Sequence, residues 1–467
     1  MNDAGLYTSG RMSDPATRDE PLIVSVSGLR GVVGGALTED VAVRYADAFA
    51  ATLPPGPIVI GRDGRPSGPA LAAAIASRLA DLGRDVVDCG VAATPTIGIV
   101  VREHAAAGGI QISASHNPAR YNGMKLFSAA GRVLTAAAGA EVLARYESGA
   151  STTAAAAPGR IVPGDGTAAH VQRVAEIVNV SAIRRRRPRV WIDCGHGAGS
   201  RVALPLLEHL GCEVIAEGAT PDGAFEHEPE PTAENLAGLL PRVAASGADV
   251  GFFQDPDADR LAIAAGDGTY LGEEATLALA VDGVLATTPG PVVVNCSTSG
   301  MTSAIAARHG CACHVSKVGE ANVVDAMLAC GAVIGGEGNG GVIDPRVVLV
   351  RDSFVAMALL LDRLAADASA TVAGLAAALP RMVMRKTKID LAPSLRGPGL
   401  ESGLARIAAA FPEATASRLD GLRLDWPGGW LLVRASNTEP IVRIVAEAGD
   451  AGAVDAAIDR AACALRG

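Results

Sequence analysis

Three aspartates stand at alternate positions in the segment DPDADR, residues 255–260, next to a proline that disfavours a helix. In a turning loop such carboxylates can converge on one hard cation such as Mg²⁺, and without a partner they would repel one another. A calcium-binding EF loop is excluded, because Arg260 stands where that loop needs glycine and Gly266 where it needs glutamate. The alternative is a solvated acidic loop. The candidate ligands are Asp255, Asp257 and Asp259.

A polar turn, SASHNP at residues 113–118, follows an apolar run and precedes the segment YNGMK, which ends at Lys125. This pattern places a hydroxyl at the end of a strand, where open α/β sheets bind ligands. Ser115 and His116 do not by themselves form a hydrolase dyad, because neighbouring side chains rarely face each other. The alternative is an Asn-Pro turn with a capping serine.

A glycine-rich segment, GGEGNGG, spans residues 335–341 and carries one acid and one amide. Glycines let a backbone approach a ligand closely, and Glu337 and Asn339 offer hydrogen-bonding groups to hydroxyls. The alternative is a flexible loop. The Walker pattern GxxxxGK[ST] does not occur in the sequence, so this is not a nucleotide phosphate loop of that kind.

A basic and polar segment, RASNTEP, begins at Arg434 and is followed by Arg443. Two arginines, two hydroxyls, an amide and the N–H groups of a loop suit a phosphate dianion. The alternative is a polar turn between two strands.

Two other patterns favour structural interpretations. The group His309, Cys311, Cys313 and His314 lacks a second CxxC pair and is too cramped for a typical zinc site. The basic run 184–187 directly precedes a strand pattern, and we interpret it as a solvated linker instead of a nucleic-acid patch.

The chain has 467 residues, which predicts two to four domains. With 49% hydrophobic and 19% charged residues it is not a disordered chain. A net charge of −10 and a pI of about 5.4 argue against general nucleic-acid binding and against binding to anionic membranes. Anionic substrates remain possible if the basic side chains are concentrated in a cleft.

The 8 cysteines are too few for a disulfide scaffold, and we expect reduced, mostly buried thiols. The polar residues 1–20 contain no signal-peptide core, and we expect a mobile arm there. No run of 18 apolar residues occurs later. We therefore expect a cytoplasmic protein without a membrane partner.

Short strand patterns alternate with helical patterns of 12–15 residues, which is typical of βαβ units. The pattern restarts after the low-complexity segment 148–160 and again after Pro289-Gly290, and it becomes antiparallel in character from about residue 381. We predict three related α/β domains with mixed sheets and a C-terminal α+β domain around a central cleft. The expected boundaries are 1–20 (arm), 21–158, 159–288, 289–380 and 381–467.

The four loops, in this order, resemble those of the α-D-phosphohexomutase family of phosphoglucosamine mutases, phosphomannomutases and phosphoglucomutases. The match runs from about Leu22 to Ala448 and includes SGLRGVVG, residues 27–34, which resembles the family's amino-terminal signature. The resemblance implies an isomerase that moves a phosphoryl group through a phosphoserine and a sugar 1,6-bisphosphate, which also serves as primer.

The resemblance implies a role for each matching residue. Ser115 is the phosphoserine, whose phosphate would join the aspartates in binding one Mg²⁺ per chain. The implied catalytic residues, linked to proton transfer or to charge stabilisation, are Lys125, Arg30, His116 and Arg260. The implied contacts with the phosphosugar substrate are Glu337, Asn339 and Lys317 for the sugar side, and Arg434, Ser436, Asn437, Thr438 and Arg443 for the phosphate that does not react.

The sequence departs from many family members at two places. Asn339-Gly340-Gly341 replaces Ser-Gly-His, and Asn437 replaces a glycine; both variants resemble the archaeal-type branch. We expect a phosphoglucosamine mutase, with a phosphomannomutase/phosphoglucomutase as the alternative, as a monomer or homodimer. A metal-dependent sugar phosphatase is more remote, because it needs neither a phosphoserine nor a second phosphate grip. A non-catalytic binding protein would be expected to lack Ser115 or an acidic ligand.

Overall fold

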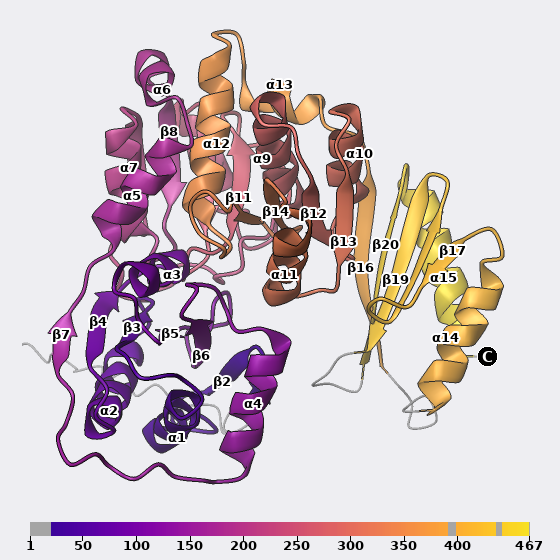
Figure 1. Cartoon of the computed structure of the whole chain (residues 1–467). Helices are drawn as coiled ribbons and strands as arrows, with labels where there is room; N and C mark the ends of the chain where they lie inside the picture. The colour runs from indigo at the N-terminus through magenta and orange to yellow at the C-terminus, as the bar shows by residue number, and fades with distance from the viewer. Residues whose placement is uncertain (1–19, 391–397, 436–440, 467) are drawn as a thin grey trace, which may run out of the picture.

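The computed structural model describes residues 20–390, 398–435 and 441–466, so residues 1–19 of the expected arm lie outside the described residues. The described chain forms four β-sheets in sequence order, each covered by helices (Figure 1). This arrangement confirms the predicted fold class, and it places four groups of loops around one cleft.

The first sheet has the strand order β1-β2-β6-β5-β3-β4-β7. Its strands are β1 (Ile23–Ser25), β2 (Gly28–Val32), β3 (Ile58–Arg62), β4 (Val86–Val91), β5 (Gly108–Ile112), β6 (Tyr121–Ser128) and β7 (Ile161–Pro163). Its helices are α1 (Glu39–Ala50), α2 (Gly68–Asp81), α3 (Thr94–Glu103) and α4 (Ala136–Glu147). Strands β3 and β5 are parallel, whereas β6 returns antiparallel to β5, so the sheet is mixed.

The second and third sheets have four strands each, in the orders β11-β10-β8-β9 and β13-β12-β14-β15. The strands are β8 (Arg189–Asp193), β9 (Glu213–Glu217), β10 (Val250–Gln254), β11 (Leu261–Ala265), β12 (Val292–Asn295), β13 (Cys313–Ser316), β14 (Ile334–Glu337) and β15 (Gly341–Ile343). The helices are α5 (Thr167–Glu176), α6 (Val180–Arg186), α7 (Ser200–His209), α8 (Leu240–Ser246), α9 (Glu273–Thr287), α10 (Gly300–Arg308), α11 (Glu320–Cys330), α12 (Ser353–Ala366) and α13 (Val372–Ala377).

The three α/β units share one device. In each, a parallel strand is followed directly by an antiparallel strand: β5 by β6, β10 by β11 and β14 by β15. The loop inside each of these pairs carries a sequence motif: SASHNP, DPDADR and GEGNG respectively. Equivalent positions in three related units therefore supply three of the four expected loops.

The C-terminal unit is an antiparallel sheet of order β16-β20-β19-β18-β17 covered by two helices. Its elements are β16 (Val383–Asp390), α14 (Pro398–Ala410), β17 (Thr415–Ser417), β18 (Leu422–Trp426), β19 (Gly429–Ala435), β20 (Ile441–Ala448) and α15 (Ala451–Arg466). The antiparallel strands predicted from about residue 381 onward are confirmed.

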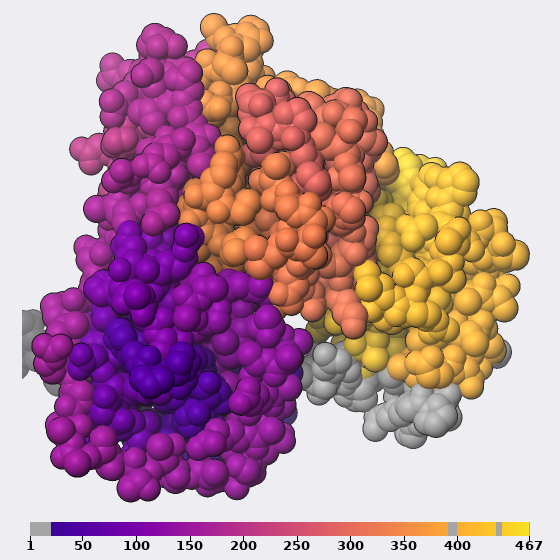
Figure 2. All heavy atoms as spheres, viewed as in Figure 1, coloured from indigo at the N-terminus to yellow at the C-terminus, as the bar shows by residue number. Residues whose placement is uncertain are grey.

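The units differ in how their cores connect. One buried apolar cluster runs through the first three units and includes Val59, Val190 and Val292. The C-terminal unit has a separate core of its own. It reaches the third unit through a small cluster of Cys296 with Trp430 and Leu432, and it projects to one side in the space-filling view (Figure 2).

Some details differ from the sequence-based expectations. The basic run is not a linker: Arg184 to Arg186 form the last turn of α6, where Arg184 donates to the carbonyl of His209 and Arg186 to that of Ala370.

Strand β7 follows the expected boundary at 158 yet pairs with β4, and α9 precedes the boundary at 288 yet packs on β14. The domain boundaries therefore stay predictions.

Three further features bear on the sequence-based interpretation. All eight cysteines are free thiols, but the expectation that most of them are buried is wrong: Cys194 and Cys296 are buried, five others are partly buried and Cys463 is exposed. His309 pairs with Asp282, and the cysteines beside it join no cluster of metal-ligand type within the described residues. In the part of the chain that the structure describes, no helix is both long and apolar enough to cross a membrane.

Candidate active site

The loop between β5 and β6 presents Ser115 in a strained conformation. Its φ is +51°, a region that residues other than glycine rarely adopt, and its side chain is buried. The backbone N–H of Ser115 donates to Ser113 Oγ at 2.8 Å, which stabilises this turn. The Ser115 hydroxyl donates to Asp255 Oδ2 at 2.8 Å, so the loop of the first unit meets that of the second at this serine.

Arg65, which the sequence analysis did not select, binds the backbone of that loop. The fully buried guanidinium donates to four backbone carbonyls of the loop: those of Ser115, Asn117, Pro118 and Tyr121. Asp63 fixes Arg65 at 3.0 Å and also accepts the hydroxyl of Ser113 at 2.7 Å. The sequence signal that could have identified Arg65 is its pairing with Asp63 in the segment GRDGR, residues 61–65, at the end of an apolar strand.

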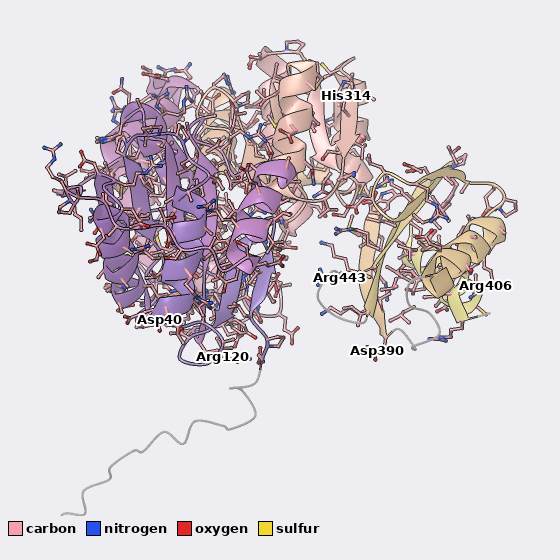
Figure 3. The ribbon with its side chains drawn as sticks, turned by 60° about the horizontal axis from the view of Figure 1, so that its bottom comes forward. Asp40, Arg120, His314, Asp390, Arg406 and Arg443 are labelled. Atoms are coloured by element: carbon pink, nitrogen blue, oxygen red, sulfur yellow. The ribbon has the colours of Figure 1, made fainter. Side chains whose placement is uncertain are left out.

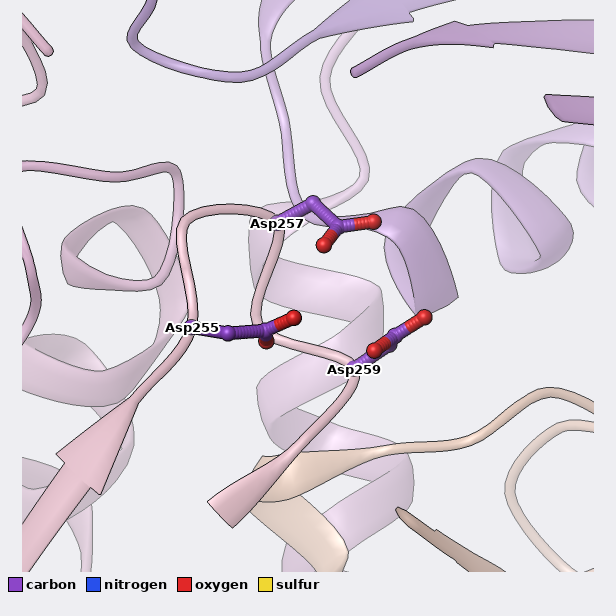
Figure 4. Close-up of side chains that lie close together, drawn as sticks. All are labelled: Asp255, Asp257 and Asp259. Carbon is purple, nitrogen blue, oxygen red and sulfur yellow. The ribbon is translucent and has the colours of Figure 1, made fainter. Parts of the chain in front are cut away.

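The loop between β10 and β11 brings the three aspartates together. One oxygen of each carboxylate lies within 4.8 Å of one oxygen of the others, and all three side chains are buried (Figure 4). Asp257 Oδ1 and Asp259 Oδ1 have no hydrogen-bond partner. Buried acceptors without a partner are costly unless a cation or water satisfies them. The donor set therefore fits a hard divalent cation such as Mg²⁺.

The other oxygens of this cluster are already engaged. Lys125 Nζ on β6 lies 2.6 Å from Asp257 Oδ2 and 2.6 Å from Asp259 Oδ2. Burial alone would lower the pKa of the Lys125 ammonium, but the two carboxylates raise it above its ordinary value. Lys125 is therefore a cation in this structure, and the unpartnered Oδ1 atoms remain for a metal.

Electrostatics shifts two of the acids in opposite directions. Burial and the charges of Asp259 and Asp257 raise the pKa of Asp255 well above its ordinary value. Burial would raise the pKa of Asp259 as well, but Arg351 and Lys125 hold it below its ordinary value. Asp255, which accepts the hydroxyl of Ser115, is therefore more ready than Asp259 to take up a proton when no cation is bound.

The remaining expected catalytic residues surround this centre. The backbone N–H of Arg260 donates to Asp255 Oδ1 at 3.1 Å, while Arg260 and Arg30 both line the cleft. Burial lowers the pKa of Arg30, and Asp257 partly offsets the shift. His116 Nδ1 lies 3.4 Å from Ser115 Oγ. Burial and the charges of Arg260 and Arg30 lower the pKa of His116 to about 2, so this imidazole is neutral.

The glycine-rich segment around the loop between β14 and β15 places Glu337 at the end of β14, where its carboxylate is buried and accepts three hydrogen bonds. Its Oε1 accepts from Asn295 Nδ2 at 2.7 Å and from the backbone N–H of Gly319 at 3.0 Å, and its Oε2 accepts from Arg351 at 2.8 Å. One lone pair of Oε2 remains for a ligand hydroxyl. Asn339 also lines the cleft, and its Oδ1 is buried without a partner. Arg351 and Asn295 were missed by the sequence analysis, because their polar side chains belong to no glycine-rich or acidic motif.

The fourth expected loop lies partly outside the described residues, which exclude Ser436, Asn437 and Thr438. The strands on either side are described. Arg434 on β19 lies directly opposite Arg443 on β20 in the antiparallel register, and Figure 3 shows Arg443 on the side of the C-terminal unit that faces the other units. Arg434 pairs with Asp420 at 2.9 Å. Two arginines opposite each other on neighbouring strands place two guanidinium groups close together, a geometry that suits binding of a phosphate.

One cleft of about 620 Å³ connects these groups. Its wall is contributed by all four units, and the expected site residues that line it are Arg30, Lys125, Arg260, Lys317, Glu337, Asn339 and Arg434. Ser115 and the aspartates lie buried beside it, next to Lys125. The arrangement combines a buried serine hydroxyl, three acids that fit a cation and an arginine on the wall of the C-terminal unit, which suits phosphoryl transfer on a phosphorylated ligand.

The chain matches four family models in order. They are the phosphoglucomutase/phosphomannomutase alpha/beta/alpha domains I, II and III, over residues 22–153, 168–268 and 273–382, and the C-terminal domain of the same family over residues 400–462.

Two relatives match this chain over nine tenths of its length. A phosphoglucomutase/phosphomannomutase of Thermococcus kodakarensis is 36% identical over 90% of this chain and 93% of its own length. A probable phosphoglucosamine mutase of Methanopyrus kandleri is 34% identical with the same coverage. A crystal structure of a phosphoglucomutase/phosphomannomutase family protein from Burkholderia thailandensis superposes with a TM-score of 0.83 at 27% identity, covering 95% of this chain and 98% of that one.

Proposed function

The chain belongs to the phosphoglucomutase/phosphomannomutase family and is a phosphohexomutase, and we propose that it works through a phosphorylated Ser115. The observation that carries this proposal is the position of the Ser115 hydroxyl: buried, 2.8 Å from Asp255 and beside a cleft that four units line. A phosphoryl group on this oxygen would lie among the cations of the site.

In the proposed reaction, phospho-Ser115 gives its phosphoryl group to the free hydroxyl of a hexose monophosphate, and the product is a hexose 1,6-bisphosphate. The P–O bond to serine breaks as the P–O bond to the sugar forms, and the hydroxyl proton passes to a nearby base. The bisphosphate then reorients in the cleft, and its other phosphoryl group is transferred to the Ser115 oxygen, which leaves the isomeric hexose monophosphate. A hexose 1,6-bisphosphate also primes an enzyme that has lost its phosphate.

We assign one Mg²⁺ to Asp255, Asp257 and Asp259, with a phosphate oxygen of phospho-Ser115 as a further ligand. The two unpartnered Oδ1 atoms support this assignment. The ion would withdraw charge from the transferring phosphoryl group. Three carboxylates and a phosphate of charge about −1.5 to −2 near pH 7 would otherwise repel the substrate phosphate.

The chain's own cations complete the charge balance. Arg30 and Arg260 line the cleft beside the reacting phosphate and would stabilise the charge that spreads over its oxygens. Lys125 would neutralise Asp257 and Asp259, which it contacts at 2.6 Å, and is the candidate for proton transfer with the sugar hydroxyl. His116 stays neutral beside Ser115 and would act as a hydrogen-bonding group.

At the sugar end, Glu337, Asn339 and Lys317 would contact the hydroxyls of the hexose. Arg434 and Arg443, together with Ser436, Asn437 and Thr438 from outside the described residues, would bind the phosphate that does not react. Arg434 lines the same cleft as Lys125 from a different unit, and this second basic group argues against a simple phosphatase, which needs no second phosphate grip. The presence of Ser115 and all three aspartates argues against a non-catalytic binding protein.

As substrate we propose glucosamine phosphate, which the name of the Methanopyrus relative favours. The second candidate is a mutase for mannose and glucose phosphates, favoured by the name of the Thermococcus relative. The test is an assay of the purified protein on glucosamine 6-phosphate, mannose 6-phosphate and glucose 6-phosphate with Mg²⁺ and glucose 1,6-bisphosphate. The highest kcat/KM on glucosamine 6-phosphate supports the first candidate, and release of inorganic phosphate without isomerisation would contradict both.

A further inference from the structure

Arg351 lies between two loops: the loop of the three aspartates, residues 255–260, which we call the metal loop, and the glycine-rich loop with Glu337, residues 336–340, which we call the sugar loop. One terminal nitrogen donates to Asp259 Oδ2 at 2.6 Å, and the other donates to Glu337 Oε2 at 2.8 Å. A third carboxylate, that of Glu320, lies 3.4 Å from Arg351 Nε and also accepts the backbone N–H of Arg351. The side chain is buried, so this cation is almost fully enclosed by acids of two different units.

The segment that carries Arg351 is itself held firmly. The next residue, Asp352, caps helix α12 through the N–H groups of Phe354 and Val355. Its other oxygen lies 2.7 Å from His170 of the second unit, and His170 contacts Thr96 of the first unit at 2.9 Å. Arg351 therefore extends from a fixed point of the backbone, which is the condition for one side chain to orient two loops.

The stem of Arg351 also fills the space that a side chain at position 341 would need. A Cβ placed on Gly341 would lie 2.3 Å from Arg351 Cδ and 2.9 Å from its Cγ. Gly341 does not have a left-handed φ, so its backbone would accept another residue. Gly340, by contrast, has a φ of +85° and needs glycine for its backbone. At position 341 glycine is required by the neighbouring arginine.

We propose that Arg351 is the positioning residue that fixes the sugar loop against the metal loop, with its stem in the place of a side chain at position 341. By binding Oδ2 of Asp259 it leaves Oδ1 for the cation, and by binding Oε2 of Glu337 it limits that acid to a single sugar hydroxyl. Arg351 binds the two carboxylates through two different terminal nitrogens of one planar fork, whereas a lysine at this position would offer a single nitrogen in place of both. The inference rests on the proposed function, because that function assigns Glu337 to the sugar.

The test measures binding of glucose 6-phosphate, mannose 6-phosphate and glucosamine 6-phosphate to the unprimed protein by calorimetry, beside kcat and KM of the primed enzyme. We expect Arg351→Ala to weaken binding and to raise KM by at least about tenfold. Arg351→Lys should recover part of this loss, because an ammonium can bind one of the two carboxylates. Arg346→Ala is the matched control, since Arg346 pairs with Asp344 in the same segment, and it should leave binding unchanged.

A second pair of variants tests the shared space. Gly341→Ala should displace Arg351 and reproduce about fivefold or more of the binding loss, whereas in an Arg351→Ala background it should add less than about twofold. Gly238→Ala, at a position with open space around its Cβ, is the control. Circular dichroism monitors folding, and Gly341→Ala and Arg351→Lys keep the test valid if Arg351→Ala does not fold.

The outcomes separate the two ideas. A wild-type protein that binds none of the three sugar phosphates would contradict the proposed function itself. Wild-type binding that Arg351→Ala retains, with only a lower melting temperature, would overturn the positioning role alone. Additive losses for Gly341→Ala and Arg351→Ala would show that the two positions do not share one space.

Discussion

The two ends of the cleft hold their cations in different ways. At the end beside Ser115, the side chains of Lys125 and Arg351 are 14% and 9% exposed; Lys125 contacts two buried carboxylates and Arg351 contacts three. At the far end, Arg434 is 26% exposed and bonds one partly exposed acid, Asp420. The catalytic end is thus an enclosed network, whereas the far end is a more open ion pair.

This difference matches what the proposed reaction would require of each end. Charge would develop on a phosphoryl group beside Ser115, where groups that are already oriented in a water-poor site would stabilise it without rearranging. The far end would bind the phosphate that does not react and release it each time the bisphosphate reorients. A partly exposed arginine with one ion pair can exchange its partner for a phosphate at little cost. The comparison predicts large effects for changes at the first end and small effects at the second.

The largest effect is expected for Ser115→Ala, which removes the oxygen that carries the phosphoryl group. Turnover should fall by about 10⁴-fold or more, as for the loss of other catalytic nucleophiles. Intact-mass measurement should show about 80 Da of added phosphate in part of the wild-type protein after priming, and none in the variant. Full activity of the variant, with no phosphate on the primed wild-type protein, would end the phosphoserine proposal.

The next largest effect concerns the metal. Asp257→Asn removes a charge that both Lys125 and the expected cation need, and kcat should fall by about 10²–10³-fold. Excess chelator should abolish wild-type activity and Mg²⁺ should restore it, whereas Ca²⁺, with its longer bonds, should restore little. Far-UV circular dichroism should be unchanged, because Asp257 belongs to a loop between strands and not to the apolar core. Unchanged turnover in chelator would show that the acids act without a metal.

The same contrast explains what could be predicted from the sequence. Ser115, the three aspartates and Glu337 stand in short motifs at the ends of strand patterns, so their places could be predicted from the sequence, whereas their chemical roles stay proposals. Arg65 and Arg351 could not be identified from the sequence, because each binds partners that are tens of residues away. Arg65 donates to backbone carbonyls at and near Ser115, and Arg351 donates to the carboxylate of Asp259. Such long-range bonds leave no local pattern, and a single arginine after a strand is common in any α/β protein.

The element boundaries show a similar limit. The strands and helices follow local periodicity, so the alternating pattern of the first three units was predictable. The basic run 184–187 was taken for a linker because its charges hide the helical pattern of α6, which carbonyls of other segments complete. Strand β7 pairs with β4, and helix α9 packs on β14. Both contacts cross an expected boundary, because they depend on parts of the chain that are distant in the sequence.

A smaller effect at the catalytic end is expected for Arg65→Lys. An ammonium cannot reach four carbonyls and Asp63 together, so the phosphoserine loop should lose its fixed geometry while keeping its charge. We expect kcat to fall by about 10–100-fold with KM nearly unchanged, because misplacement affects the reacting oxygen more than substrate binding. Arg62→Lys is the control, since Arg62 makes one long contact, of 3.4 Å, with a carbonyl. An equal loss in both variants would contradict the role given to Arg65.

The smallest effect, at the far end, is expected for Asp420→Asn. Asp420 pairs with Arg434 at 2.9 Å and also accepts the backbone N–H of Val318 from the third unit at 3.0 Å. The amide oxygen of asparagine can keep the bond to Val318, whereas the negative charge that competes with a phosphate for Arg434 is lost. Since exposed ion pairs are weak, KM for the sugar phosphate should fall by about two- to fivefold with kcat nearly unchanged, and the difference should shrink at high salt. Steady-state kinetics at two ionic strengths measures both effects, and Asp420→Ala, which also loses the bond to Val318, separates charge from contact. A loss of activity above tenfold in Asp420→Asn would mean that the far end is as rigidly organised as the catalytic end.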